Sequence, residues 1–517
     1  MANKQLFKSQ PGRLAPATNA RNEAGGGAYA LSPKAALAQY VATGCLNATF
    51  YADAATQLDT VLELCAKVGP AFVAQAAMYA RRRGQMKDMP ALLTVWLAQH
   101  GPDRLEPVFA KVIDNGRMLR NFVQILRSGA VGRKSLGNRP KRLVQNWLNG
   151  RSDGQLLGAS VGNNPSLADV LKMVHPKPAT PERAAFYAWL IGKPHDAALL
   201  PEAVKALERF RNDAAAPVPD VPFELLTALP LQPQHWVAIA CQAPWQMTRM
   251  NLNTFARHEV FKVGGMAQRI AERLRDPAAI RRARVFPYQL LSAYFMTSEG
   301  VPEVVRDALQ DALEVALENV PELAGQIYVL LDVSGSMGSP VTGHRKGATS
   351  KVRCVDVAAL VAAAISAKNP ATEILPFDTQ VHAHRLNRRD SVLTNAQTLA
   401  QFGGGGTNCG LPLAMLNQRK AAGDLVIYVS DNESWADPQR GRGTETMRQW
   451  ETFRQRNPQA RLVCIDIQPY GTVQAQTRED VLNVGGFSDA VFEVLARFAA
   501  GQLGGEHWVR EIEAVEV

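Results

Sequence analysis

Cysteine is scarce in this sequence of 517 residues, and no two of its six cysteines have the C-x-x-C spacing of a zinc site. The cysteines are scattered along the chain without a histidine cluster beside them, which also excludes a disulfide framework. We expect reduced, mostly buried thiols at all six positions, which are Cys45, Cys65, Cys241, Cys354, Cys409 and Cys464.

Long apolar runs are missing as well. The N-terminus has no apolar segment of the kind found in signal peptides. No stretch reaches the roughly 18 uninterrupted apolar residues that a membrane-spanning helix requires. The sequence therefore predicts a soluble, cytoplasmic protein without a membrane partner.

Motifs of nucleotide hydrolysis and of nucleophilic catalysis do not occur in the sequence. Gly338 and Gly343 have the spacing of a phosphate-binding loop, but His344 and Arg345 follow where that loop needs Lys and Ser or Thr. No Ser/His/Asp or Cys/His arrangement stands out. The basic part of the chain also lacks the clustered carboxylates that a nuclease would need. We predict that the protein is not an enzyme.

Positive charge is unevenly distributed along the chain. Residues 1–325 contain 38 basic and 27 acidic side chains, whereas residues 326–517 contain 19 and 20. Within the first part, residues 111–151 carry ten basic side chains and one acid, and residues 249–284 carry nine and three. Solvated faces of amphipathic helices are the alternative explanation, but two windows this lopsided favour a polyanionic partner.

The pattern over the basic part predicts helices throughout. Residues 1–28 are polar and rich in glycine and alanine, and we expect them to form a flexible arm. Over residues 29–322, short segments place apolar side chains at i, i+3, i+4 and i+7 and end at glycine. Such a succession of short helices is typical of stacked helix pairs, as in HEAT-like solenoids.

Strands and helices alternate over residues 323–517. Near-continuous apolar strands such as QIYVLLD at 326–332, DLVIYVS at 424–430 and ARLVCID at 460–466 are separated by helical segments. This alternation predicts an α/β doubly wound domain, with a parallel sheet covered on both faces. Ligands of such folds bind beyond the carboxyl ends of the strands.

Oxygen-bearing side chains gather where these predicted strands end and the following helices begin. Two carboxylates and three hydroxyls have this placement, without a sulfur or nitrogen ligand among them. Hard oxygen donors suit Mg²⁺ or Mn²⁺, and a hydroxyl-rich set leaves room for water and for an outside ligand. A serine-rich turn that caps a helix is the alternative, but it would not explain the Thr and the second Asp at other strand ends. The predicted metal ligands are Asp332, Ser334, Ser336, Thr407 and Asp431.

The arrangement D-x-S-x-S, followed by a distant Thr and a distant Asp, resembles the metal-ion-dependent adhesion site (MIDAS) of von Willebrand factor A domains. The resemblance covers residues 326–517, and all five expected positions are present. It implies a metal ion with an open coordination position that takes a carboxylate from a partner protein.

Several segments of the helical part resemble the Ro autoantigen, or TROVE-domain, family in its bacterial branch. Where relatives have a basic, aromatic segment, this chain has LGASVGNN at 157–164, so one expected contact to the RNA backbone lacks its residues. With the A domain, the resemblance spans nearly the whole chain. The segments that carry it are FVQILRSG at 122–129, GRKSLGNRPKRL at 132–143 with Trp147, LADVLKMVHPKP at 167–178 and WQMTRMNLN at 245–253.

This family resemblance implies a multi-domain monomer with a flexible arm (1–28), an all-α, HEAT-like TROVE domain (29–322) and an A domain (323–517) that closes a ring. It implies binding of small non-coding Y RNAs on the outer basic face and of single-stranded ends of defective RNAs in the hole. It also implies a role in RNA quality control, with an exoribonuclease such as polynucleotide phosphorylase as partner.

Basic side chains of the helical part would neutralise RNA phosphates and read the shape of the RNA rather than its base sequence. A protein of a different class is the alternative: a metal-dependent interaction module that docks an acidic partner through the A domain. The predicted RNA-contacting residues are Arg120, Arg133, Lys134, Arg139, Lys141, Arg142, His175 and Arg249.

Overall fold

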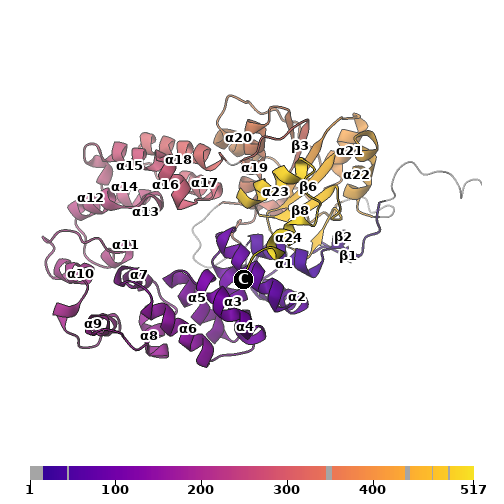
Figure 1. The fold of residues 1–517 in the computed structure, drawn as a ribbon. Helices are drawn as coiled ribbons and strands as arrows, with labels where there is room; N and C mark the ends of the chain where they lie inside the picture. Colours follow the sequence, from indigo (N-terminus) through magenta and orange to yellow (C-terminus); the bar gives the residue numbers. More distant parts are fainter. Residues whose placement is uncertain are drawn as a thin grey trace, which may run out of the picture. The chain divides into compact units, whose positions relative to one another are not determined.

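A computed structural model describes residues 15–43, 46–318, 320–344, 352–436, 443–468, 470–486 and 489–517. The chain forms two compact units, and Figure 1 shows their helices and strands. The C-terminal domain, here unit 1, also includes the chain up to Phe72, which the sequence assigned to the arm and the helical domain. Unit 1 comprises Met1–Phe72, Phe286–Ser292 and Ala316–Val515, and unit 2 comprises Val73–Val285, Ala293–Val315 and Glu516–Val517.

A parallel five-stranded sheet forms the centre of unit 1. In spatial order its strands are β4 (Thr372–Phe377), β3 (Ile327–Asp332), β5 (Leu425–Ser430), β6 (Arg461–Asp466) and β8 (Val481–Gly485). Val329 of β3 pairs with Ile374 of β4 on one side and with Ile427 of β5 on the other. Every residue of β3, β5 and β8 is buried, as near-continuous apolar strands require. The predicted α/β doubly wound domain is confirmed.

Helices cover both faces of this sheet (Figure 1). Their bounds are α1 (Pro33–Thr43), α19 (Cys354–Lys368), α20 (Val392–Leu399), α21 (Leu411–Gln418), α22 (Glu445–Arg456), α23 (Asp489–Ala499) and α24 (His507–Glu513), with a 3₁₀ turn η3 (Gly335–Gly338). On one face, Trp450 and Phe453 of α22 pack with Tyr328 and Tyr428 of the sheet. On the other face lies α19, which is buried from its first residue to Ser366.

The N-terminal segment is held on unit 1. Its strands β1 (Ala20–Arg21) and β2 (Gly27–Ala30) form an antiparallel pair, and β2 pairs with β7 (Thr472–Val473). The amide of Asn22 also donates a hydrogen bond to the backbone oxygen of Ser434, at 2.7 Å. Strand pairing at residues 20–21 and 27–28 thus lies within the span that the sequence predicts as a flexible arm. Residues 1–14 lie outside the described part of the chain, as does Cys45.

Unit 2 is built of helices that pack on neighbours close in sequence, as the predicted solenoid requires (Figure 1). In α5, Asn115 caps the first turn by accepting a hydrogen bond from the backbone N–H of Met118 at 3.0 Å, and Gly129 ends the helix at φ 88°. The helices are α3 (Asp88–His100), α4 (Pro102–Val112), α5 (Gly116–Ser128), α6 (Asn138–Asn149), α7 (Asp153–Ala159), α8 (Leu167–Val174), α9 (Pro181–Leu190), α10 (Glu202–Asn212), α11 (Phe223–Leu226), α12 (Pro233–Gln242), α13 (Trp245–Met250), α14 (Leu252–Arg257), α15 (Met266–Arg275), α16 (Pro277–Ala283) and α18 (Glu303–Ala316), with the 3₁₀ turns η1 (Ala197–Leu199) and η2 (Val260–Lys262).

Two further helices, α2 (Ala54–Arg82) and α17 (Pro287–Phe295), are shared between the units, and the last residue of α18, Ala316, also belongs to unit 1. By length and hydropathy, α2 alone among the helices of the described residues could cross a membrane. However, Gly69 has non-helical angles (φ 79°, ψ 169°) and breaks it into two pieces. Neither piece reaches the roughly 18 apolar residues of a span. Half of the apolar window is buried in the protein, which is typical of a core helix.

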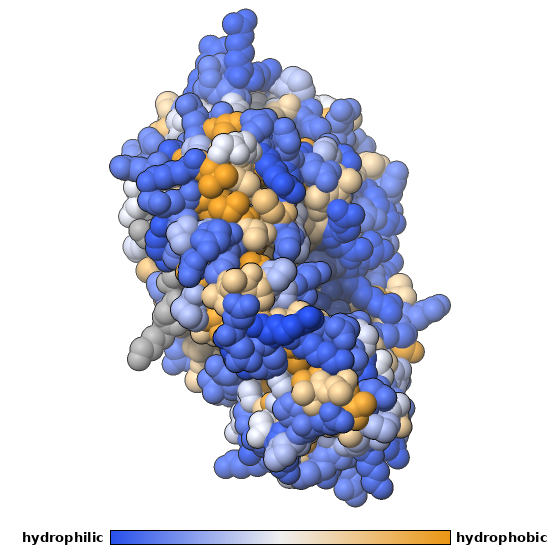
Figure 2. Space-filling model, turned by 90° about the vertical axis from the view of Figure 1, so that its left-hand side faces the viewer, coloured by the Kyte–Doolittle hydropathy of each residue, from blue (hydrophilic) through white to orange (hydrophobic). Residues whose placement is uncertain are grey.

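The molecular face drawn in Figure 2 is mostly hydrophilic, and its hydrophobic side chains gather in a few small groups. Small apolar groups of this kind are ordinary on soluble proteins. The ring implied by the family resemblance depends on how the two units sit, and it stays a prediction.

Candidate functional site

Three of the predicted metal ligands meet at the sheet edge where β3 ends and η3 begins. Asp332 is the last residue of β3 and is fully buried. The backbone N–H of Ser334 donates to Asp332 Oδ1 at 2.9 Å, and the hydroxyls of Ser334 and Ser336 are 3.3 Å apart. The short turn thus brings the polar side chains of D-x-S-x-S together.

Asp431 joins this group from the end of β5. Its Oδ1 accepts a hydrogen bond from the backbone N–H of Glu433 at 3.2 Å, and Ser336 is near enough to lower its pKa. The hydroxyl of Ser430 donates to Asp332 Oδ2 at 2.5 Å, and the backbone N–H of Asn432 donates to that same hydroxyl at 2.9 Å. Because β3 and β5 are neighbours in the sheet, Ser430 of β5 orients the carboxylate of Asp332 at the end of β3.

Thr407 is buried. The glycine run that precedes it lies against the backbone of the same turn. The backbone N–H of Gly335 donates to the oxygen of Gly405 at 2.9 Å. Gly403 has φ 93°, and a side chain there would collide with Val333. Only glycine allows this close approach. The structure thus places the glycine run before Thr407 against the turn that carries Ser334 and Ser336.

The carboxylates of this edge are strongly perturbed. Burial, together with the nearby Asp431 carboxylate, raises the pKa of Asp332 to about 7. Burial also raises the pKa of Asp431, and burial with the charge of Asp431 raises the pKa of Glu433 to about 8. The pKa of Asp466, at the end of β6, is raised by burial and by both neighbours. Buried carboxylates this close favour a cation between them.

The donor set fits a divalent cation that prefers oxygen. Among the described residues, Asp431 Oδ2 is buried without a hydrogen-bond partner. Mg²⁺ or Mn²⁺ would satisfy this oxygen and offset the repulsion between Asp332 and Asp431. The described part of the chain contains no group of three or more His, Cys, Asp or Glu side chains that could hold a metal. That finding agrees with a set in which hydroxyls supply the remaining ligands.

Sequence reasoning missed the residues that support this site. Ser430 and Asp466 end β5 and β6, so the strand-end rule that found Asp332 could have found them. Glu433 gave no such signal. It is buried, and its Oε2 accepts a hydrogen bond from the backbone N–H of Ala24 in the β1–β2 turn at 3.2 Å. That partner comes from a distant segment and is supplied only by the fold.

Free cations of the predicted RNA site lie on α6 and in the loop before it. Lys141 and Arg142 are in the first turn of α6, and Lys134 is in the loop. Within the described ranges, none of the three side chains has a hydrogen-bond or ion-pair partner. Lys134 and Arg142 are exposed. A phosphate would therefore meet these cations without displacing an internal partner.

The turn after α8 lies against α6 and adds to this basic surface. Gln145 Nε2 donates to the oxygen of Val174 at 2.6 Å, and Asn149 Nδ2 donates to the oxygen of Lys177 at 3.1 Å. Exposed His175 sits between them and ends α8 in the left-handed region, at φ 50°. Lys177, which the sequence did not single out, is exposed beside it. We define the α6 surface as Lys134, Lys141, Arg142, His175 and Lys177.

Arg133 and Arg139 are less available than their neighbours. The guanidinium of Arg133 donates to the backbone oxygens of Ser135 and Leu136 at 3.0 and 3.1 Å, and to that of Ala98 at 3.5 Å. Arg139 lies 3.7 Å from fully exposed Asp103, a pair that water screens strongly. Arg133 therefore shapes the loop before α6, while Arg139 stays available to a stronger anion.

Arg120 lies in a separate cleft of about 700 Å³, which Arg117 and Arg151 also line. Its guanidinium donates to the oxygen of Ala159 at 2.6 Å. Burial lowers the pKa of Arg120, and the charge of Arg117 lowers it further. The segment 157–164, where the chain departs from the family pattern, forms one wall of this cleft. Arg117 and Arg151 were counted in the basic window but not singled out.

Arg249 lies in α13, in a different part of the helical region from α6 (Figure 1). Its side chain donates to Gln246 Oε1 at 3.4 Å. The structure thus divides the predicted RNA residues into three places: the α6 surface with Arg133 and Arg139, the cleft with Arg120, and α13.

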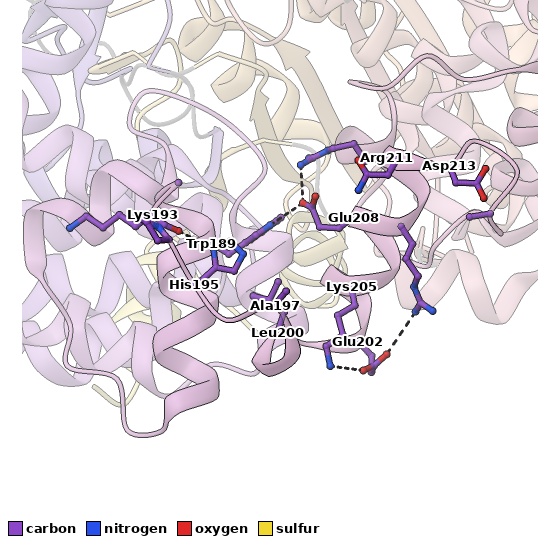
Figure 3. A pocket seen from close by; sticks show the side chains of 15 residues that line it. Trp189, Lys193, His195, Ala197, Leu200, Glu202, Lys205, Glu208, Arg211 and Asp213 are labelled. Atoms are coloured by element: carbon purple, nitrogen blue, oxygen red, sulfur yellow. Dashed lines mark hydrogen bonds and ion pairs between the residues drawn. The ribbon is translucent and has the colours of Figure 1, made fainter.

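A groove of about 1350 Å³ between α9 and α10 also carries cations, shown in Figure 3. Lys205 pairs with Glu202 at 3.0 Å, and Arg211 pairs with Glu208 at 2.8 Å. Glu208 also accepts a hydrogen bond from the indole N–H of Trp189 at 3.0 Å. These cations already have acidic partners, so the groove is a poorer phosphate site than the α6 surface.

Comparisons with known proteins agree with this architecture. The family model described as the Ro60 vWA domain matches residues 326–499. The RNA-binding protein RO60 of Deinococcus radiodurans is 28% identical, over 93% of this chain and 96% of that protein. The RNA-binding protein RO60 of Caenorhabditis elegans is 25% identical, over 45% of this chain and 37% of that protein. The crystal structure of the D. radiodurans Ro (RSR) protein superposes with a TM-score of 0.63 at 23% identity, and covers 91% of this chain and all of that one.

The chain is thus a helix-rich protein that carries a von Willebrand factor A domain with a MIDAS-type sequence motif. More narrowly, these comparisons support a Ro-like protein with a C-terminal A domain of the Ro60 type, as the sequence predicts.

Proposed function

We propose that this chain is a non-enzymatic RNA-binding protein whose α6 surface binds the phosphate backbone of a small structured, Y-like RNA. The observation that carries the proposal is the set of exposed cations without internal partners on α6 and its loop. Exposed cations of this kind neutralise phosphates without reading bases. The names of the two RO60 relatives support RNA as the ligand.

Single-stranded RNA ends are the second proposed ligand. Arg249 in α13 and the cleft with Arg117, Arg120 and Arg151 offer cations away from the α6 surface. A folded RNA body on one surface with its free end elsewhere fits a role in RNA quality control. An exoribonuclease such as polynucleotide phosphorylase would then act on the presented end.

We also propose that the five predicted ligands of unit 1 hold Mg²⁺ or Mn²⁺. The bound ion would supply a positive charge that attracts a carboxylate from a protein partner. The unpaired Asp431 Oδ2 and the buried Asp332 beside it support this part of the proposal. None of the five described cysteines forms a disulfide, which supports a cytoplasmic location.

RNA recovered with the purified protein tests the main proposal. We expect the wild type to carry a small set of structured RNAs that sequencing identifies. The triple variant Lys134→Ala, Lys141→Ala and Arg142→Ala should lose most of this RNA. Equal RNA recovery from wild type and variant would contradict RNA binding on the α6 surface and favour the protein-docking alternative.

A further inference from the structure

A short segment from the N-terminal part of the chain lies at the mouth of the proposed metal site. Asn47 Nδ2 donates to the backbone oxygen of Thr342 at 2.7 Å, and His344 N–H donates to the oxygen of Ala48 at 2.6 Å. Both contacts fix residues 47–52 to the loop that follows the D-x-S-x-S turn. The segment lies outside the residues that match the A-domain family.

Tyr51 brings a phenol hydroxyl from this segment to the metal-binding residues. Burial raises the pKa of this hydroxyl, and so do the nearby charges of Asp431 and Glu433, which puts the hydroxyl close to the proposed site. The ring of Tyr51 packs edge-on against that of Tyr470, with centroids 5.8 Å apart. Tyr470 is in turn fixed by a hydrogen bond from its hydroxyl to Gln468 Oε1 at 3.3 Å. Tyr51 is therefore held in place, with a donor group directed at the site.

Two exposed aromatic side chains flank the same site. Phe50 is 56% exposed and packs edge-on against Tyr51, with centroids 4.8 Å apart. Trp435 is 50% exposed, and its ring covers Gly406, beside the predicted ligand Thr407. Phe50, Tyr51 and Trp435 form what we call the aromatic rim. Exposed aromatic residues around a buried polar centre are typical of protein interfaces.

We propose that Tyr51 is a positioning residue that donates a hydrogen bond to a carboxylate placed on the metal by a partner protein. Phe50 and Trp435 then contact a large apolar side chain next to that carboxylate. The fitting partner is thus a protein segment with Asp, Glu or a C-terminal carboxylate beside an apolar residue. This inference rests on the proposed metal site.

The charges near the site favour a protein carboxylate over RNA. The hydrogen bonds recorded for the carboxylates of Asp332 and Asp431 come from hydroxyls and backbone N–H groups, not from Lys or Arg. Residues 326–517 carry 19 basic and 20 acidic side chains. An RNA segment would need several cations to offset its phosphates, whereas one carboxylate needs only the metal.

Mn²⁺ bound to the full-length protein provides the assay, because the relaxation of water protons falls when a carboxylate displaces water from the ion. The probes are acetate, 3-phenylpropionate and the uncharged 3-phenylpropanamide, at constant ionic strength. In the wild type, 3-phenylpropionate should displace water at a lower concentration than acetate does. The amide should have no effect.

The variants separate the two parts of the aromatic rim. Tyr51→Phe keeps the ring, and should bind Mn²⁺ within about 2-fold of the wild type but need about 10-fold more acetate, as expected for loss of a hydrogen bond to a charged group. Phe50→Ala and Trp435→Ala should leave the response to acetate unchanged. They should lower the preference for 3-phenylpropionate over acetate by about 2- to 10-fold. Tyr470→Phe is the matched control and should respond to acetate as the wild type does.

Each contrary result has a distinct meaning. A wild type that binds no Mn²⁺ would overturn the proposed metal site, and this inference with it. If the wild type binds Mn²⁺ and Tyr51→Phe responds to acetate equally, the inference alone is overturned. If Tyr51→Phe abolishes Mn²⁺ binding, Tyr51 acts on the metal itself and not on the carboxylate. Displacement of water by a single-stranded oligonucleotide at lower concentration than 3-phenylpropionate would overturn the protein partner.

Discussion

Replacing Lys134, Lys141 and Arg142 together by alanine should weaken RNA binding by an amount that counterion release predicts. Within the described chain these side chains have no internal partners, so their removal leaves no buried group unsatisfied. Surface substitutions of this kind change the free energy of unfolding by about 0.5 kcal/mol or less each. A large loss of affinity would therefore report on RNA contacts and not on the fold.

The expected magnitude follows from the number of phosphates that the three cations neutralise. Each contact adds about 0.7 to 0.9 to the slope of log K against log salt concentration. Three contacts account for a slope of about 2 to 2.7, so the variant should bind about 100- to 500-fold more weakly at 0.1 M salt. The two binding curves should converge as the salt concentration approaches 1 M.

Fluorescence anisotropy with a labelled copy of the co-purified RNA, titrated at several salt concentrations, measures both quantities. The matched control removes the same charge from the groove between α9 and α10, by replacing Lys193, Arg209 and Arg211 with alanine. The slope of log K against log salt concentration for this control should differ from that of the wild type by less than about 1. If the α6 variant kept the wild-type slope, or the control lost as much, the α6 surface would not be the RNA interface.

Three further predictions concern stability. Mn²⁺ at 100 times its Kd should stabilise the wild type by about 2.7 kcal/mol. Asp431→Asn should abolish this stabilisation in a thermal melt without destabilising the metal-free protein. If the variant kept the full stabilisation, the ion would bind elsewhere. Arg133→Ala should lower the free energy of unfolding in urea by about 1 to 3 kcal/mol, because the guanidinium of Arg133 bonds to backbone oxygens. The salt dependence of RNA binding should not change. A weaker salt dependence would mean that Arg133 contacts RNA. Gly26→Ala should loosen the β1–β2 hairpin, because the added methyl group would collide with the backbone oxygen of Ser434. Hydrogen exchange of the Tyr29 amide should then become faster. An unchanged exchange rate would contradict that packing.

Local pattern was enough to predict the A domain and to select its candidate metal ligands. Strands that are buried on both sides must be apolar throughout, so β3 and β5 could be recognised as strands from the sequence. Parallel strands bring their carboxyl ends to one edge, which is why Asp332 and Asp431 were predicted to meet. Thr407 was selected as a candidate ligand because the glycines before it allow its backbone to come close to the site.

Local pattern could not predict which basic side chains are free of internal partners and so available to bind phosphate. Arg133 and Lys134 are adjacent and equally basic in sequence, yet only Arg133 reaches three backbone oxygens. One of these belongs to Ala98, which lies 35 positions earlier. Hydrogen-bond partners at such separations depend on how helices pack, and charge counts do not contain that information.

The sequence by itself determined the helical and α/β halves of this Ro-like protein, its basic windows and its five candidate metal ligands. These features follow from periodicity, burial and strand direction, which act over a few residues. Only the tertiary structure decided that the N-terminal segment belongs with the A domain and that Tyr51 lies near the carboxylates of the proposed metal site. The reason is physical: such contacts join residues hundreds of positions apart, and no local propensity specifies which distant surfaces will meet.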